Sequence, residues 1–315
     1  MISNRSSRGN RKFLPRIESV VNGYPFIQHR ITESSAEIRD VLAAFASQPI
    51  DVLAINGGDG TAAAVLGCLF NESPFERPPK VILLPGGTAN MSAGDVGMRG
   101  NLPRAVSRLV EWAQGKHRNC ELLQRAVLRV QPGPQQPASY GMFMGAGIIM
   151  QGTKYAHREI HSRGLGDQLS LGLGLVRTVW GWLRHDPQFY QPIRLGYALD
   201  DNEPATEEDT VLLLVSTLQR LFLGIRPYWG QEPGVLRLSV IRDHPEHFLR
   251  AFPAVLRGRP NRFVTPPAGY LSHNAQHIKL YMNGSYNLDG EIFHAQRAAG
   301  PVIISNAGEI TFLKI

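Results

Sequence analysis

Two glycine-rich segments carry the residue types best suited to binding a phosphate. The first is Gly57-Gly58-Asp59-Gly60-Thr61, and the second is Pro85-Gly86-Gly87-Thr88-Ala89-Asn90. Glycine lets the backbone approach a phosphate closely and adopt positive φ, so that its N–H groups can act as donors. The threonine hydroxyls of both segments add further donors. The sequence therefore predicts a pair of phosphate-binding loops.

Asp59 limits the kinds of phosphate chemistry that the first loop could carry out. A carboxylate repels a phosphate unless a cation or the proton of a nucleophile lies between them. It indicates either Mg²⁺–nucleotide binding or proton abstraction. Taken singly, each loop is equally well explained as a tight turn in which Asp59 and Thr61 cap a helix; two such loops in order favour phosphate binding. Neither G-x-x-x-x-G-K-[ST] nor a helix-opening G-x-G-x-x-G occurs, so the sequence supports neither a Walker nucleotide site nor a Rossmann dinucleotide site.

Alternating elements position both loops. Short apolar runs at 51–55 and 81–84 precede the loops and predict strands, and helices are expected at 61–70 and 102–114. Upstream, Phe13 to Val21 predicts a helix, 24–31 a strand, and Ser34 with Glu37 the capping box of a further helix. Apolar strands separated by helices predict a parallel sheet covered on both faces. Ligands bind at the carboxyl ends of such strands, so the two loops should line one crevice.

Beyond about residue 118 the pattern becomes rich in strands. Asn283-Gly284 is a hairpin signal, 301–315 predicts a terminal hairpin, and two helices are expected at 169–183 and 245–256. We therefore predict an α/β nucleotide-binding domain over 1–118 and a β-sandwich substrate domain over 119–300. The hairpin of 301–315 would return to the first domain. The strand-like runs lie at 122–130, 139–144, 193–199, 211–216, 235–241 and 277–282.

Composition excludes several classes of protein. The 315 residues carry 33 Lys+Arg and 26 Asp+Glu, a net charge of +7, which fits an anionic partner. Two cysteines cannot form a disulfide framework, and a cytoplasmic setting is expected. No apolar run is long enough to span a membrane, and the basic N-terminal segment lacks the apolar core of a signal peptide.

The two loops together resemble the signature loops of the diacylglycerol kinase catalytic-domain family, which includes bacterial lipid kinases and sphingosine kinases. Asn4-Arg5-Ser6-Ser7-Arg8-Gly9 is similar to the family's N-terminal nucleotide loop, and Thr32 matches a threonine placed on ATP. Asp289-Gly290-Glu291 matches the late motif that carries the proton acceptor. The resemblance implies that Asn4, Ser7, Gly9, Thr32 and Asn90 join the two loops in binding nucleotide.

The same resemblance implies ATP-dependent phosphorylation of a lipid hydroxyl in a cleft between the two domains. Glu291, with Asp289 beside it, would take the hydroxyl proton, and Asp59 would hold the Mg²⁺ of ATP or orient the acceptor. The sequence departs from the family pattern at Arg5, where proline is preferred, and at Met91, where aspartate is usual. In bacterial members of the family, an aspartate just before a glycine holds a structural Mg²⁺. The matching segment here is Glu232-Pro233-Gly234, with Pro233 in place of that aspartate, so this Mg²⁺ site is expected to be absent.

The predicted helix at 169–183 carries Trp180 and Trp182 and is followed by Arg184. Tryptophan and basic residues are favoured at a membrane interface, so these three side chains are predicted to contact an anionic membrane. The alternative is a buried segment of the second domain. With the early basic block beside the proposed ATP loop, nucleic acid is not expected as a partner. The expected location is the inner membrane face, by peripheral association.

Two other functions remain open at this stage. A soluble small-molecule kinase of the NAD kinase type shares the Gly-Gly-Asp-Gly loop, and a nucleotide- or lipid-binding protein without catalysis fits the lost family residues. The late Asp-Gly-Glu and the strand-rich second half favour the lipid kinase. Whether the chain forms a homodimer is also left open.

Overall fold

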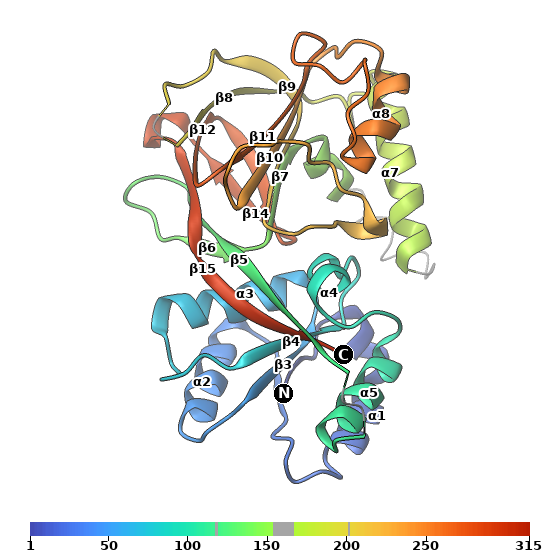
Figure 1. The fold of residues 1–315 in the computed structure, drawn as a ribbon, viewed down its shortest axis with the longest axis vertical. Helices are drawn as coiled ribbons and strands as arrows, with labels where there is room; N and C mark the ends of the chain where they lie inside the picture. Colours follow the sequence, from blue (N-terminus) through green and yellow to red (C-terminus); the bar gives the residue numbers. More distant parts are fainter. Residues whose placement is uncertain (117–118, 154–166, 201) are drawn as a thin grey trace. The chain divides into compact units, whose positions relative to one another are not determined.

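The computed structural model describes residues 1–116, 119–153, 167–200 and 202–315, and these fall into two compact units (Figure 1). Unit 1 comprises Met1–Val127 together with Gly308–Ile315, and unit 2 comprises Leu128–Ala307. Two long strands, β5 (Glu121–Gln131) and β15 (Val302–Lys314), contribute residues to both units. The assignment of nucleotide to the first part of the chain and lipid substrate to the second stays a prediction.

Unit 1 is a parallel sheet in the order β15-β4-β3-β1-β2. Its strands are β1 (Ile2–Asn4), β2 (Arg30–Thr32), β3 (Val52–Gly57) and β4 (Lys80–Pro85), joined at Phe312 by the end of β15. The helices are α1 (Arg8–Val21), α2 (Ser35–Ala46), α3 (Asp59–Glu72), α4 (Met91–Val96) and α5 (Leu102–Ala113). The predicted α/β fold with a parallel sheet is confirmed.

The sheet of unit 1 is buried on both faces because its strands are apolar at consecutive positions. Ile82 and Leu84 of β4 pack in one cluster with Ile17 of α1 and Leu102 of α5, while the alternate residue Leu83 is also buried. Period-two alternation sends neighbouring side chains to opposite faces, so an unbroken apolar run needs cover on both sides. The strands of unit 1 are therefore packed on both faces, and the loops begin where these strands end.

Unit 2 is built from antiparallel strands in the order β14-β13-β7-β9-β8-β12-β15, with β10 paired to β9 and β11. Its core gathers inward side chains of these strands, such as Leu213, Leu238 and Tyr286. The predicted strand-rich second part is confirmed. The strands are β6 (Ser139–Gly141), β7 (Phe143–Gly147), β8 (Ile193–Leu199), β9 (Glu208–Ser216), β10 (Leu236–Arg242), β11 (Tyr270–Ala275), β12 (His277–Met282), β13 (Gly284–Leu288) and β14 (Glu291–Ala295).

Two hairpin predictions are wrong. The strands on either side of Asn283 do not pair with each other: β12 pairs with β8 and β15, and β13 pairs with β7 and β14. The tight turn is instead Asp289-Gly290, both at positive φ, between Leu288 and its partner Glu291. The predicted terminal hairpin is one continuous strand, β15, because its first residues pair with β12 and Phe312 pairs with β4.

Unit 2 also contains the two expected helices, α7 (Asp167–Leu183) and α8 (Phe248–Arg257), and the short 3-10 helices η1 (Phe222–Gly224) and η2 (Arg297–Ala299). The start of α8 differs from the prediction, because His247 precedes it in the left-handed conformation. In the part of the chain that the structure describes, no helix combines the length and apolar character needed to cross a membrane.

The loop that contains Pro233 is held to β11 by side chains of the protein itself. His273 Nδ1 lies 2.6 Å from Glu232 Oε1, and the N–H of Asn274 donates to Glu232 Oε2 at 3.1 Å. Burial by itself would raise the pKa of Glu232, but hydrogen bonds from His273 and from backbone N–H groups outweigh it and lower the pKa to about 2. The folded state therefore favours the ionised form of Glu232.

This pair predicts a pH-dependent contribution to stability. The pKa of Glu232 is about 2 in the folded protein and 4.5 ordinarily. Ionised Glu232 therefore adds its full share to the free energy of unfolding above about pH 4.5, and this share is lost as the pH falls from 4.5 to about 2. We expect Glu232→Gln to lower the melting temperature near neutral pH and to match the wild type near pH 2. Glu76→Gln, at an exposed position of unit 1, is the control. A difference between wild type and variant that is constant with pH would contradict this assignment.

Candidate functional site

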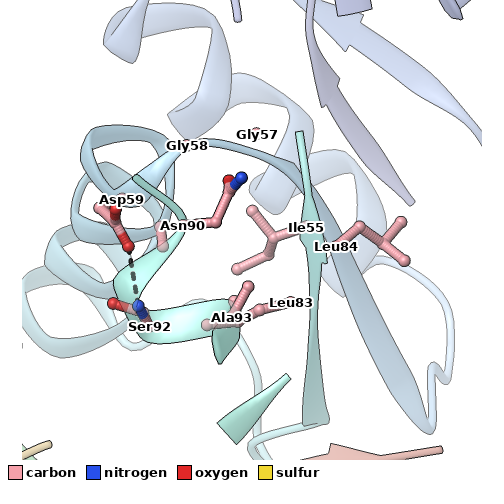
Figure 2. A pocket seen from close by; sticks show the side chains of 10 residues that line it. Ile55, Gly57, Gly58, Asp59, Leu83, Leu84, Asn90, Ser92 and Ala93 are labelled. Carbon is pink, nitrogen blue, oxygen red and sulfur yellow. Dashed lines mark hydrogen bonds between the residues drawn. The ribbon is translucent and has the colours of Figure 1, made fainter. Parts of the chain in front are cut away.

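Three loops meet in unit 1 at the carboxyl ends of neighbouring strands. The segment after β1 leads into α1, Gly57-Gly58 joins β3 to α3, and Gly86 to Asn90 joins β4 to α4. In the sheet, β3 lies between β1 and β4, so the loops are brought together. A pocket lies between the second and third loops (Figure 2). Its lining comprises Ile55, Gly57, Gly58, Asp59, Ala62, Leu83, Leu84, Asn90, Ser92 and Ala93.

Asp59 ties the two glycine loops together. Its side chain is buried, with Oδ1 accepting the N–H of Ser92 at 2.9 Å and Oδ2 accepting the N–H of Met91 at 3.1 Å (Figure 2 shows the Ser92 bond). Burial raises the pKa of Asp59 above its ordinary value, although the hydrogen bonds from Ser92 and Met91 oppose that shift. The first residue of α3 therefore holds the first turn of α4. Its predicted roles in metal binding or catalysis stay predictions.

The other end of α4 is anchored by an ion pair that sequence reasoning missed. Arg125 Nε lies 3.2 Å from Asp95 Oδ2, and both side chains are nearly buried. Arg125 comes from β5, so α4 is fixed to α3 at one end and to β5 at the other. The sequence offered no signal for this pair, because the two residues are far apart along the chain and belong to different elements.

Glycines allow the two loops to approach backbone to backbone. A Cβ atom built on Gly87 would lie 2.4 Å from the Cα of Gly58, and one built on Gly86 would lie 2.9 Å from the backbone nitrogen of Gly57. Both distances are far shorter than a van der Waals contact, so larger residues would force the loops apart. The glycines are thus required by packing inside the site as well as by any approach of a ligand.

In the second glycine loop, the N–H groups of the two glycines already have partners within the site. Gly86 N–H donates to the carbonyl of Gly57 at 3.1 Å, and Gly87 N–H donates to Asn90 Oδ1 at 2.7 Å. Asn90 Nδ2 in turn donates to the Gly87 carbonyl at 3.0 Å. By contrast, the N–H groups of the first turn of α3, which includes Gly60 and Thr61, have no partner within the helix. They are the better-placed donors for a phosphate.

Asn4 connects the loop after β1 to the loop between β3 and α3. Asn4 Nδ2 donates to Thr61 Oγ1 at 2.9 Å, and Asn4 Oδ1 accepts the N–H of Ser6 at 2.9 Å. Gly9 N–H donates to the carbonyl of Gly86 at 2.9 Å, and this bond joins the segment after β1 to the loop between β4 and α4. The predicted residues Asn4, Thr61, Gly9 and Gly86 are therefore gathered in one network.

Two buried asparagines complete this network and were missed by sequence reasoning. Asn10 Nδ2 donates to the carbonyls of Asn4 at 2.7 Å and of Asn56 at 3.1 Å, and Asn56 Nδ2 donates to Ser3 Oγ at 2.9 Å. Asn10 and Asn56 are buried; both amide nitrogens have partners, whereas neither Oδ1 atom has a hydrogen-bond partner among the described residues. An asparagine at the end of an otherwise apolar strand, as at Asn56, was the signal available in the sequence.

The remaining predicted nucleotide residues lie at the edge of the network. Ser7 precedes the first residue of α1, without a side-chain hydrogen bond to the helix. Thr32 ends β2; its side chain is buried, and Oγ1 has no hydrogen-bond partner among the described residues. Arg5 N–H donates to the Thr32 carbonyl at 3.0 Å, so the two lie together. Thr88 is half-buried in the third loop.

The Asp-Gly-Glu motif lies in unit 2 as the turn between β13 and β14. Asp289 is buried at positive φ; its Oδ2 accepts the N–H of Met142 at 2.7 Å and its Oδ1 that of Phe143 at 3.1 Å. Its carboxylate thus holds the turn against the start of β7. Glu291, the first residue of β14, is exposed. Within the motif, Asp289 is engaged with the backbone and Glu291 is exposed, and their predicted catalytic roles stay predictions.

The predicted membrane residues separate into exposed and buried groups. Trp180 is exposed, and the guanidinium of Arg184 lies 4.8 Å from the centre of its ring. Trp182 is buried, with its ring 4.7 Å from that of Phe248, in a core that also includes Phe189. A membrane contact by Trp182 is therefore wrong, because that side chain faces the core of unit 2. The prediction for Trp180 and Arg184 is compatible with their exposure.

Comparison with known proteins finds a family model that is similar to the first part of the chain. Residues 1–124 match the family model of the diacylglycerol kinase catalytic domain. The resemblance to this family is confirmed. The match covers the three loops and the helices α1 to α5, so the network around Asp59 lies within the matched residues. This supports kinase activity, and with it the use of ATP, without defining the acceptor.

Solved structures extend the likeness of the fold over the whole chain. A diacylglycerol kinase structure from Bacillus anthracis str. Sterne shares 17% sequence identity at a TM-score of 0.59, covering 100% of this chain and 94% of that chain. A second structure from the same organism, assigned as a diacylglycerol kinase, shares 18% identity at a TM-score of 0.63, covering 100% of this chain and 95% of that one. None of the curated proteins compared matches the chain.

The close approach of the glycine loops leads to a paired mutational prediction. In Gly87→Ala the new methyl group would meet the Cα of Gly58 at 2.4 Å, so we expect a loss of about 2 kcal/mol in unfolding free energy. ATP affinity in the kinase-family domain should fall roughly tenfold, which is a similar free energy. Calorimetry would measure both quantities.

Gly94→Ala is the matched control, because Gly94 lies within α4 and a Cβ atom there meets nothing within 4 Å. We expect it to be neutral or to stabilise the protein by up to about 1 kcal/mol, the usual gain for alanine in a helix. Equal effects of the two substitutions would show that the contact between Gly87 and Gly58 is not the cause.

Proposed function

We propose that the protein is an ATP-dependent kinase that transfers the γ-phosphate of ATP to a lipid hydroxyl, in the manner of a diacylglycerol kinase. The observation that carries this proposal is the network of three loops around Asp59, in a domain that matches the diacylglycerol kinase family. Phosphoryl transfer depends on positioning and on charge stabilisation, which a rigid cluster of backbone donors supplies.

The phosphates of ATP are assigned to the start of α3. The first N–H groups of this helix lack partners within it, and the helix dipole adds positive potential at the same point. Gly58 and Gly60 are partly exposed there, whereas Thr61 is buried with its hydroxyl on Asn4. The role of Thr61 is therefore to hold the first loop, and that of the second glycine loop is to pack against α3.

Glu291 is the proposed general base. In the reaction the lipid hydroxyl oxygen forms a bond to the γ-phosphorus, the bond from that phosphorus to the bridging oxygen breaks, and ADP leaves. The hydroxyl proton passes to the Glu291 carboxylate. Support comes from the exposure of Glu291 at the start of β14 and from Asp289, whose two backbone hydrogen bonds fix the turn that precedes it.

Mg²⁺ is expected to arrive with ATP rather than in a site built by the protein. Among the described residues, no three acidic, histidine or cysteine side chains lie together as a metal site. Both oxygens of Asp59 already accept backbone N–H groups. Because Mg²⁺ is commonly held through substrate phosphates, it would neutralise phosphate charge there. The absence of a separate Mg²⁺ site built by the protein, expected from Pro233, stays a prediction.

Labelling experiments separate this proposal from its alternatives. Incubation of the purified protein with γ-labelled ATP and a total lipid extract should yield labelled lipid. A labelled water-soluble product from a metabolite extract would instead identify a soluble small-molecule kinase. Nucleotide binding without transfer to either extract would identify a binding protein without catalysis and overturn the proposed activity.

Two carboxylate variants distinguish a residue that acts in the reaction from one that holds the site in place. We expect Asp59→Ala and Glu291→Ala each to abolish lipid phosphorylation. Asp59→Ala should also lower the melting temperature, because it leaves the N–H groups of Met91 and Ser92 buried without partners, at about 1–3 kcal/mol each. Glu291→Ala, at an exposed position, should leave both the melting temperature and ATP affinity unchanged. Activity like the wild type in Glu291→Ala would remove the general-base role.

A further inference from the structure

A row of buried polar side chains lies beneath the glycine loops of unit 1. Asn56 is the residue before Gly57-Gly58, and alternation along β3 places its side chain on the same face of the sheet as Ala54. Ala54 packs there in an apolar cluster with Ile82 and Leu84. Asn56 is completely buried, although an apolar residue would suit that face better. Core packing therefore does not explain the amide at this position.

Asn56 is in contact with both glycine loops. Its backbone continues directly into Gly57, and its Oδ1 lies 2.6 Å from the place that a Cβ atom of Gly86 would take. Its carbonyl accepts the Nδ2 group of Asn10 at 3.1 Å. Because the Oδ1 atoms of both asparagines have no hydrogen-bond partner among the described residues, the two amides cost stability. A side chain that lowers stability while touching both loops indicates a functional role.

The amide of Asn56 is held from outside the glycine loops by Ser3 and His29. Asn56 Nδ2 donates to Ser3 Oγ at 2.9 Å, and Ser3 Oγ lies 2.8 Å from His29 Nε2. Ser3 belongs to β1, which lies between β3 and β2, and His29 directly precedes β2. The hydrogen bonds therefore run across the sheet from the loop side of β3 to the start of β2.

The direction of these hydrogen bonds follows from the protons available. Ser3 Oγ accepts from Asn56, so its own single proton is available for the neutral Nε2 of His29. Burial, together with the positive charges of the N-terminal amine and of Arg30, lowers the pKa of His29 to about 4. The ring is therefore neutral near neutral pH, and His29 can accept the proton of Ser3.

A serine beside a histidine is also the pattern of a nucleophile and its base. Ser3 is completely buried, however, so its oxygen is closed to a substrate. The hydroxyl has Asn56 on one side and His29 on the other. The pair therefore acts on other residues of the protein rather than on a ligand.

We infer that His29 and Ser3 are positioning residues of the candidate ATP site and act on it through Asn56. His29 orients the Ser3 hydroxyl, and this hydroxyl fixes the amide of Asn56. The amide in turn fixes how closely the ends of β3 and β4 approach, where Gly57 and Gly86 lie. Loops that are already in place bind a phosphate more tightly, because they need no reordering. The inference deepens the proposed function and rests on it for the identity of the ligand.

Ser3→Ala tests the inference by removing the hydroxyl between Asn56 and His29. We expect the affinity for ATP, measured by calorimetry, to fall roughly tenfold. Amide hydrogen exchange at Gly9 and Gly86 should become at least roughly tenfold faster. These two N–H groups donate to carbonyls of the glycine loops, so they report on the contact between the loops. Exchange at the rate of the wild type would overturn the inference, as would an unchanged affinity.

Ser239→Ala is the matched control for Ser3→Ala. Ser239 is a buried serine of unit 2 that donates to the carbonyl of Pro227. Both variants should lower the melting temperature, because each leaves a buried polar group without its partner. Only Ser3→Ala should change the affinity for ATP and the exchange at Gly9 and Gly86. Equal losses of affinity in the two variants would show a general effect of stability and contradict the positioning role.

Two substitutions of His29 test its role as an acceptor. His29→Gln keeps an oxygen that can accept the proton of Ser3, whereas His29→Leu does not. We expect His29→Leu to weaken ATP binding roughly fivefold and His29→Gln to retain most of the affinity. Added to Ser3→Ala, His29→Leu should change the affinity by less than about twofold, because the hydroxyl that it orients is already gone. Additive losses, or equal losses in the two His29 variants, would contradict this role.

Failure of the kinase proposal is distinguishable from failure of this inference. A wild type that neither binds ATP nor labels lipid removes the proposed function, and hydrogen exchange at Gly9 and Gly86 still decides whether Ser3 and His29 position the loops. A wild type that labels lipid, with variants that equal it in ATP affinity and in exchange, removes only the inference.

Discussion

The organisation of the candidate site depends on one buried carboxylate. Asp59 accepts the N–H groups of Met91 and Ser92, so the first residue of α3 fixes the first turn of α4. A buried charge is costly unless hydrogen-bonded, and two N–H groups at a helix start satisfy it while the helix dipole stabilises it. This requirement brings the β3–α3 and β4–α4 loops so close that Gly58 and Gly87 meet backbone to backbone. A larger residue at Gly87 would push these loops apart and so strain the two hydrogen bonds of Asp59.

Asp289 in unit 2 also accepts hydrogen bonds from two successive backbone N–H groups. Its carboxylate accepts the successive N–H groups of Met142 and Phe143 and holds a two-residue turn against β7. In both units, then, the aspartate of a predicted catalytic motif is engaged with the backbone. In the proposed function the phosphates are assigned to the N–H donors of α3, and the proton to the exposed Glu291. The same requirement explains why both motifs place glycine next to aspartate. An aspartate that accepts backbone N–H groups needs backbone close to it, and glycine, without a side chain, allows that approach.

Local patterns predicted the elements of unit 1 well, because each depends on neighbours in the sequence. The apolar runs at 51–55 and 81–84 became β3 and β4, and the capping box of Ser34 and Glu37 opens α2. The errors concern long-range pairing. Asn283-Gly284 had a strong hairpin composition, yet β12 found better partners in β8 and β15, and the turn moved to Asp289-Gly290. Composition describes which turns are possible, and strand pairing selects among them.

The sequence by itself determined the α/β start of the chain, the two glycine loops and their order, and the family to which residues 1–124 are similar. Only the tertiary structure decided which of those residues meet. Asn10, Asn56 and the Asp95–Arg125 pair joined the site through contacts between distant segments. Trp180 and Trp182, two residues apart, were indistinguishable as a pattern. Packing against α8 buried Trp182 and left Trp180 exposed, because the outcome depends on which face of α7 the neighbouring elements cover.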